Sequence, residues 1–159
     1  VWDAYTPWEL LVKDVPDDYK NDLDYIISLV DWDLNADPNL FQNRFSPPKP
    51  VKPIEEMHDQ GYEEKLIAYK SDFFMAKELT ILPGRSVTIK DDGAYGAIVI
   101  QGHGTVGKLS ISSPAMIRFG QLTEDELFVT KDAAANGVTI TNNSEYDDLV
   151  MLKHFGPKA

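Results

Sequence analysis

The apolar positions in the first third of the chain follow helical spacing. Leu23, Ile26, Ile27 and Val30 lie three and four residues apart, which predicts one amphipathic helix over residues 21–32. Nearer the start, Thr6-Pro7-Trp8-Glu9 predicts a short helical turn, with Thr6 as the cap and Glu9 completing a capping box. Five prolines fall between residues 35 and 53, so we predict an extended connector without helix or interior strand there.

From Leu66 onward the pattern changes to short runs of β-branched and aromatic residues, interrupted by Gly, Pro, Asn and Asp. This alternation is typical of an all-β sandwich or barrel. The predicted strands are Lys65–Tyr69, Phe73–Leu82, Ser86–Lys90, Gly96–Gln101, Gly104–Ile111, Met116–Phe119, Glu126–Thr130, Gly137–Asn142 and Asp148–Phe155. Predicted turns include Pro83-Gly84, Asp91-Asp92-Gly93, Gly102-His103-Gly104 and Asn142-Asn143-Ser144. The chain therefore divides into an arm over residues 1–64 and a barrel over residues 65–157.

The amino-acid composition excludes some classes of binding partner for this chain. The 26 acidic and 15 basic residues give a net charge of -11, which disfavours nucleic acid and anionic membrane surfaces. Apolar runs are far shorter than the roughly 20 residues of a membrane helix, so we expect a soluble chain. The absence of cysteine fits the reducing cytoplasm and excludes disulfides and thiolate metal sites. Because the chain starts at Val1 without a leader, we expect a processed product or a piece of a longer protein.

The spacing from Gly84 to Gly104 resembles the first conserved block of the cupin superfamily. The resemblance implies an all-β cupin fold, a jelly-roll or double-stranded β-helix barrel, here with an N-terminal arm of one or two short helices. On this alignment the positions of the family's metal ligands hold Lys90, Asp92 and Ala97, and the second block places Val138 at its histidine. One Asp beside a lysine cannot replace imidazoles and a carboxylate. The usual metal site is therefore predicted to be empty.

A second resemblance is to the cupin domain of proteins similar to mannose-6-phosphate isomerase. It lies in the phrases Ala76–Thr80, Gln101–Gly104, Phe119–Glu126 and Leu152–Pro157. That family holds its metal with a Gln-x-His pair, a downstream Glu and a distant His. The resemblance implies Gln101, His103, Glu126 and His154 as a rebuilt site for zinc or another divalent metal, with Glu126 or His103 moving the proton.

Several candidate residues have two interpretations. His103 is either an exposed turn histidine or a ligand or base, and His154 is either buried against backbone or functional. Glu126 belongs either to a solvated acidic turn or to general acid–base chemistry. Arg118 binds a sugar phosphate or pairs internally, while Lys90 contacts a ligand or forms a salt bridge with Asp92 across the empty pocket. Lys153, on the last predicted strand, is the third predicted ligand-binding residue beside Arg118 and Lys90. His58 lies in a charged stretch and is expected to be exposed.

Three functions follow from these observations. The leading hypothesis is a metal-free cupin module with a carbohydrate-binding or oligomer-forming role. The rival is a metal-dependent aldose–ketose sugar phosphate isomerase using Gln101, His103, Glu126 and His154. A third is a protein-interaction module whose aromatic arm, with Trp2, Trp8, Tyr25, Trp32, Phe41 and Phe45, docks onto a barrel. We expect a homodimer, because arm exchange is a common route to one.

Overall fold

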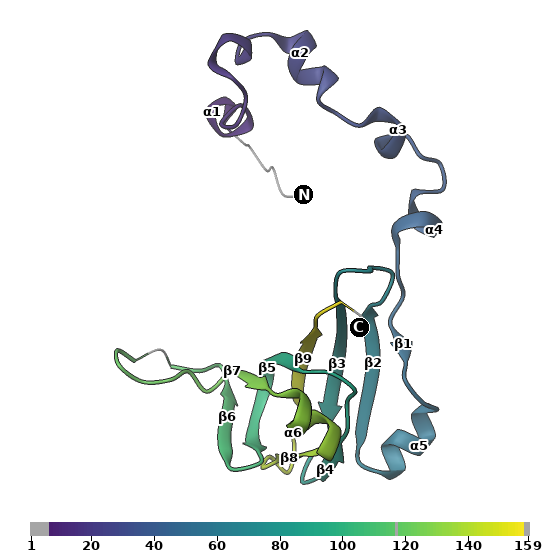
Figure 1. Ribbon diagram of the computed structural model, residues 1–159, viewed down its shortest axis with the longest axis vertical. Helices are drawn as coiled ribbons and strands as arrows, with labels where there is room; N and C mark the ends of the chain where they lie inside the picture. The colour runs from purple at the N-terminus through teal and green to yellow at the C-terminus, as the bar shows by residue number, and fades with distance from the viewer. Residues whose placement is uncertain (1–6, 117, 158–159) are drawn as a thin grey trace. The chain divides into compact units, whose positions relative to one another are not determined.

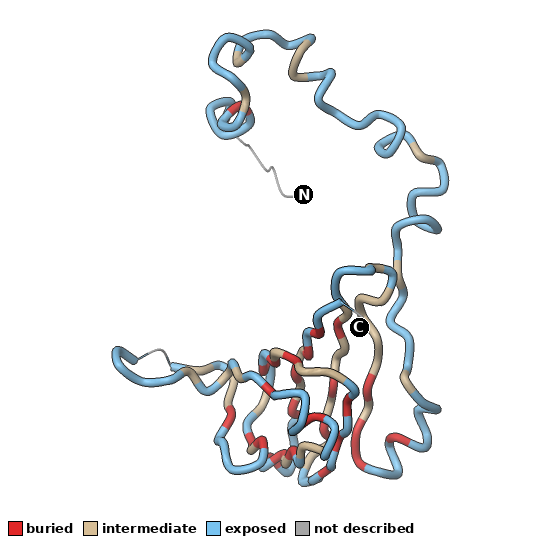
Figure 2. The backbone as a smooth tube through the Cα atoms, viewed as in Figure 1, coloured by how far each residue is buried: buried red, intermediate tan, exposed pale blue. Residues whose placement is uncertain are grey.

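The computed structural model describes residues 7–116 and 118–157, and the chain divides into two compact units between Phe45 and Ser46. The first unit, the arm, contains α1 (Trp8–Leu11), a 3-10 helix (Asp17–Tyr19), α2 (Leu23–Ser28), α3 (Trp32–Asn35) and α4 (Leu40–Arg44). None of the described α-helices of the arm contains a buried residue. In Figure 2 the arm is accordingly exposed along almost its whole length.

The helix predicted over residues 21–32 is two shorter helices. Asp22 caps α2 by accepting a hydrogen bond from the Tyr25 N–H at 3.0 Å, and Asp31 caps α3 through the Leu34 N–H at 3.0 Å. A capping residue has non-helical backbone angles, so Asp31 separates the two helices. The predicted connector also contains one helix, α4, which lies between Pro38 and Pro47 where no proline intervenes. The predicted capping residue Thr6 lies outside the described residues.

The second unit is an antiparallel β-barrel, so the predicted all-β fold with a helical arm is confirmed. Figure 1 shows its strands with the short helices α5 and α6 beside them. Its elements are β1 (Lys49–Pro50), α5 (Ile54–Asp59), β2 (Tyr62–Ala68), β3 (Met75–Ile81), β4 (Ser86–Ile89), β5 (Tyr95–Val106), β6 (Leu109–Ser113), β7 (Glu126–Val129), α6 (Lys131–Asn136), β8 (Val138–Asn142) and β9 (Leu149–Phe155). β1 and α5 belong to this unit, although the sequence placed residues up to 64 in the arm.

β5 joins the two parts of the sheet. Its first part pairs with β9 and β7, and its second part pairs with β6 and β8. The turn predicted at Gly102-His103-Gly104 is wrong, because these residues continue the strand; the chain reverses after Val106, at Gly107. Gly102 has a φ of +86° close to a register shift, and this left-handed conformation favours glycine. No strand forms at Met116, Arg118 or Phe119, and Ile117 lies outside the described residues.

Strand alternation places the core inside the barrel. On β9, Leu149, Met151, Lys153 and Phe155 are buried, while His154 between them is exposed. The same alternation buries Leu79 and Ile81 on β3, and Figure 2 shows buried residues concentrated in these strands. No helix in the described part of the chain is long and apolar enough to span a membrane.

Candidate functional site

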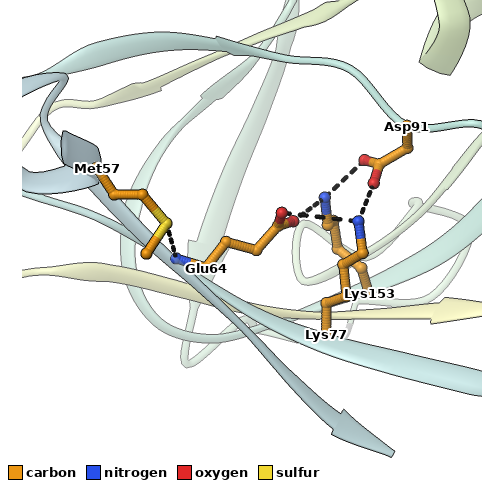
Figure 3. A network of polar contacts seen from close by, with 5 residues as sticks. All are labelled: Met57, Glu64, Lys77, Asp91 and Lys153. Atoms are coloured by element: carbon orange, nitrogen blue, oxygen red, sulfur yellow. Dashed lines mark hydrogen bonds and ion pairs between the residues drawn. The ribbon is translucent and has the colours of Figure 1, made fainter. Parts of the chain in front are cut away.

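Four charged side chains from different parts of the chain meet inside the barrel (Figure 3). Glu64 comes from β2, Lys77 from β3, Lys153 from β9, and Asp91 from the segment between β4 and β5. Lys153 Nζ lies 2.5 Å from Glu64 Oε1 and 2.6 Å from Asp91 Oδ2. Lys77 Nζ lies 2.6 Å from Asp91 Oδ1 and 3.6 Å from Glu64 Oε2. We call these four residues the buried network.

The buried network balances its own charge, since two ammonium groups face two carboxylates. Lys153 is fully buried, and the Asp91 side chain is 1% exposed. Charges removed from water in this way are tolerated only when they are paired and hydrogen-bonded. The Glu64 N–H also donates to Met57 Sδ of α5 at 3.4 Å, so the carboxylate's strand is fixed by the neighbouring helix.

Electrostatics inside the barrel favour the charged forms of Asp91 and Lys77. Burial opposes ionisation of Asp91, but Lys153 and then Lys77 outweigh it and hold the Asp91 pKa below its usual 3.8. Burial likewise opposes the charge of Lys77, yet Asp91 and Glu64 raise the Lys77 pKa above 10.5. Burial, followed by the charges of Asp91 and Glu64, raises the pKa of Tyr95. All these shifts favour the charged pairs and a neutral phenol beside them.

Two aromatic rings complete the surroundings of the lysines. Lys153 Nζ lies 5.1 Å from the Tyr95 ring centroid and 5.7 Å from that of Phe155. Lys77 Nζ lies 5.1 Å from the Phe155 centroid. Ring faces attract cations at such distances, so the two rings also stabilise the ammonium groups of Lys77 and Lys153.

The sequence interpretation missed three members of the buried network. Val87, Ile89 and Asp91 alternate on one side of the chain, so Asp91 points inward while Lys90 and Asp92 are exposed. The predicted projection of Lys90 and Asp92 into the barrel is therefore wrong, and no ion pair joins them among the described residues. Ala97 is buried and Val138 packs against the core, as predicted. Extending the same alternation to β2 and β3 would have identified Glu64 and Lys77.

A second polar site lies at the junction of β5, β6 and the loop before β9. It is an open hollow of about 320 Å³ lined by Gln101, Gly102, His103, Ser112, Ser113 and Asp147. We call it the polar hollow. His103 and Ser112 are direct partners across the β5–β6 pair, and side chains of such partners lie on one face with Cβ atoms about 4.5–5.5 Å apart. Apart from Gly102, the residues that line the polar hollow are all polar, and His103 and Ser112 share one face of the strand pair.

The loop bearing Asp147 is held by hydrogen bonds. Asn142 is 2% exposed, and its Nδ2 donates to the Asp147 carbonyl at 2.8 Å and to the Ile81 carbonyl at 3.0 Å. Ser144 Oγ accepts from the Asp147 N–H at 2.9 Å. A Cβ on Gly102 would lie 2.6 Å from the Asp148 carbonyl oxygen, so strand and loop meet closely beneath the polar hollow. Its shape is therefore set by the fold.

The structure does not bring the four predicted metal ligands together. Gln101 and His103 share the polar hollow, whereas Glu126 lines a different, largely apolar hollow of about 430 Å³. Glu126 pairs with Ile98, five residues before His103 on β5, which separates them by roughly 16 Å along the strand. His154 pairs with Gly96, farther still from His103.

A metal needs its nitrogen and oxygen donors about 2 Å away, and these residues do not meet that requirement. Across residues 7–116 and 118–157, no group of three or more His, Asp or Glu side chains could hold a metal ion. The four residues therefore do not fit the metal that the resemblance implies.

The remaining predicted residues lie apart from one another. Arg118 is exposed and its Nε donates to Met116 Sδ at 3.4 Å, so within the described chain it has no internal carboxylate. Lys153 is enclosed in the buried network and Lys90 faces solvent. His58 is exposed, as predicted, and its Nε2 lies 3.0 Å from Glu63 Oε2. His154 is exposed, so the predicted alternative of a buried histidine is wrong.

Comparisons with known proteins give likenesses of fold. No protein-family model matches the chain, and no curated protein matches it. The chain aligns with a cupin-2 domain from Rhodospirillum rubrum at 12% identity, over 72% of this chain and 73% of that one, with a TM-score of 0.47. It aligns with an RmlC-like cupin from Ralstonia eutropha at 12% identity, over 76% and 66%, with a TM-score of 0.43.

A further alignment is with a chain from the complex of Rhodobacter sphaeroides SigE with the anti-sigma ChrR. There the identity is 12%, the TM-score is 0.47, and the match covers 74% of this chain but only 55% of the other. The names of the first two structures are those of cupins, the fold that the sequence predicted. With TM-scores below 0.5, these likenesses carry no argument about ligand or activity.

Proposed function

We propose that the chain is a carbohydrate-binding module of the cupin type that works without a resident metal ion. The buried network is the observation that supports the metal-free part of this proposal, and the polar lining of the polar hollow supports the carbohydrate-binding part. Glu64 and Asp91 are the buried carboxylates of the described residues, and the ammonium groups of Lys77 and Lys153 already neutralise them. A divalent cation could enter only by displacing a lysine, which would leave that lysine's charge buried without a partner.

Metal analysis combined with thermal unfolding tests the metal-free part of the proposal. After dialysis we expect substoichiometric Zn, Mn and Fe, and an unchanged Tm when EDTA or excess Zn is added, because a ligand that binds only the folded state would raise the Tm. One tightly held metal ion per chain, or a Tm that rises with added metal, would contradict the proposal.

The metal-dependent sugar phosphate isomerase, similar to mannose-6-phosphate isomerase, is the alternative. It requires Gln101, His103, Glu126 and His154 to close on one ion, and it is tested by assaying aldose–ketose interconversion of hexose 6-phosphates with added Zn or Mn. Turnover that is lost in both His103→Ala and Glu126→Gln would establish the alternative. Absence of turnover at every metal tested would remove it.

An oligomer-forming role is a second candidate, and the arm favours it. Within the arm, apolar side chains such as Leu23, Ile27, Trp32 and Phe41 are exposed. Segments with large apolar anchors and no core of their own bury them on binding. Mass measurement in solution of the full chain and of a chain lacking residues 1–45 tests this role. A dimer that becomes a monomer on deletion supports it, and a full-length monomer contradicts it.

A further inference from the structure

The polar hollow has hydrogen-bonding capacity that the fold does not use. Within residues 7–116 and 118–157, the His103 ring, the hydroxyls of Ser112 and Ser113, and the Asp147 carboxylate have neither a side-chain hydrogen bond nor an ion pair. Only the Gln101 amide donates inward, to the Asp148 carbonyl at 3.4 Å. Five polar residues therefore line one volume, and the side chains of His103, Ser112, Ser113 and Asp147 keep donors and acceptors that the described fold does not use.

The volume of the polar hollow limits the size of its ligand. About 320 Å³ lies at the lower end of the range of roughly 300–1,000 Å³ that is typical of small-molecule sites. One monosaccharide unit fits this volume, whereas an oligosaccharide would extend beyond the lining residues. The walls are also preorganised by Asn142 and Ser144, which lowers the entropy lost when a ligand binds.

The charge of the lining selects against phosphate. Asp147 is the one formally charged side chain among the six lining residues, and no lysine or arginine is included. Phosphate sites use Arg, Lys or helix N-termini, and a carboxylate beside a phosphate would repel it. Asp147 can instead accept from two neighbouring sugar hydroxyls, while Gln101 and the serines both donate and accept.

We propose that the polar hollow binds a neutral monosaccharide or similar polyol, recognised by Asp147, Gln101, His103, Ser112 and Ser113. This inference rests on the proposed carbohydrate-binding function and narrows its ligand to an unphosphorylated sugar. It differs from the isomerase alternative, whose substrate carries a phosphate.

Ligand-observed NMR on the full chain tests the inference. The probes are glucose, mannose and fructose, each alongside its 6-phosphate, in buffer containing EDTA. We expect at least one free hexose to bind and the 6-phosphates to bind more weakly. Asp147→Asn is expected to weaken binding by about tenfold or more, because hydrogen bonds to a charged acceptor are the stronger ones. Glu145→Gln is the matched control: it removes an exposed carboxylate of the same loop that does not line the polar hollow, and binding should be unchanged.

Three results would overturn the inference. Tighter binding of the 6-phosphates would exclude a neutral ligand, and equal losses for Asp147→Asn and Glu145→Gln would place the sugar elsewhere. If no hexose binds although the fold is intact by circular dichroism, the polar hollow is not a monosaccharide site. A metal ion held by the dialysed protein would contradict the metal-free function but not this inference, because the titration contains EDTA.

Discussion

The buried network and the polar hollow lie in the same barrel, but they differ in whether their polar side chains have partners within the fold. In the buried network every charge faces an opposite charge within 3.6 Å, and the lysines also face aromatic rings. In the polar hollow, His103, Ser112, Ser113 and Asp147 are left without side-chain partners among the described residues. In the buried network the polar groups pair with one another, whereas in the polar hollow the polar groups remain available to bind a ligand.

Because of this difference, substitutions at the two sites should affect different properties: stability at the buried network and ligand binding at the polar hollow. Removing one member of a charge-paired buried network leaves its partner charged and out of water, so the effect falls on stability. Removing an exposed side chain that contacts nothing changes stability little, and any effect falls on binding. The two sites can therefore be distinguished by mutation without knowing the ligand.

The largest expected effect is that of Lys153→Met. It leaves Glu64 and Asp91 with Lys77 alone, and we expect the free energy of unfolding to fall by about 3–5 kcal/mol. Urea denaturation at pH 7 measures the change. Lys131→Met, which removes an exposed lysine on α6, is the control and should change stability by no more than about 0.5 kcal/mol. Equal effects of the two variants would show that the network contributes nothing to stability.

Gly102→Ala is expected to have the next largest effect. A φ of +86° costs a non-glycine residue about 1–3 kcal/mol, and the new Cβ would approach the Asp148 carbonyl oxygen at 2.6 Å. Gly107→Ala is the comparison, because Gly107 also has a positive φ, +57°, but nothing lies within 4 Å of the added Cβ. Gly102→Ala should therefore destabilise the barrel more than Gly107→Ala. The reverse order would contradict the close contact beneath the polar hollow.

Acid should weaken the barrel through the buried network. The pKa of Asp91 is lower in the folded protein than its usual 3.8, so its stabilising effect is present above that value and is lost as the pH falls through the folded pKa. Urea midpoints between pH 7 and pH 3 measure this loss. Asp91→Asn removes the titrating group, so its stability should depend less steeply on pH below about 4. Parallel acid curves for the two proteins would show that another group dominates.

The smallest expected effects on stability belong to the polar hollow. His103→Ala and Asp147→Asn should each change the free energy of unfolding by no more than about 0.5 kcal/mol, because neither side chain has a partner in the described fold. Thermal and urea unfolding measure this. A loss of more than about 1 kcal/mol for either variant would show a structural role and weaken the distinction between the two sites.

Much of the fold could be predicted from local patterns. The strands ending near Ile81, Ile89, Asn142 and Phe155 lie within a residue or two of the predictions, since alternation and turn residues act over short distances. Three short helices, α4, α5 and α6, were missed. α6 follows the capping residue Thr130 and precedes Gly137, and these two residues together signal a helix between them. The turn at Gly102 was misjudged because a glycine with positive φ can also bend a continuous strand.

Local sequence patterns were enough to predict that the later part of the chain forms a β-barrel, that the arm is helical in places, and that the aligned ligand positions lack histidines. Which charged residues meet depends instead on how the strands pair. Glu64, Lys77, Asp91 and Lys153 lie up to 89 positions apart, from 64 to 153, and come together because antiparallel pairing brings β2, β3 and β9 side by side. Alternation assigns each residue to one side of its strand, but strand order and register decide what it faces there.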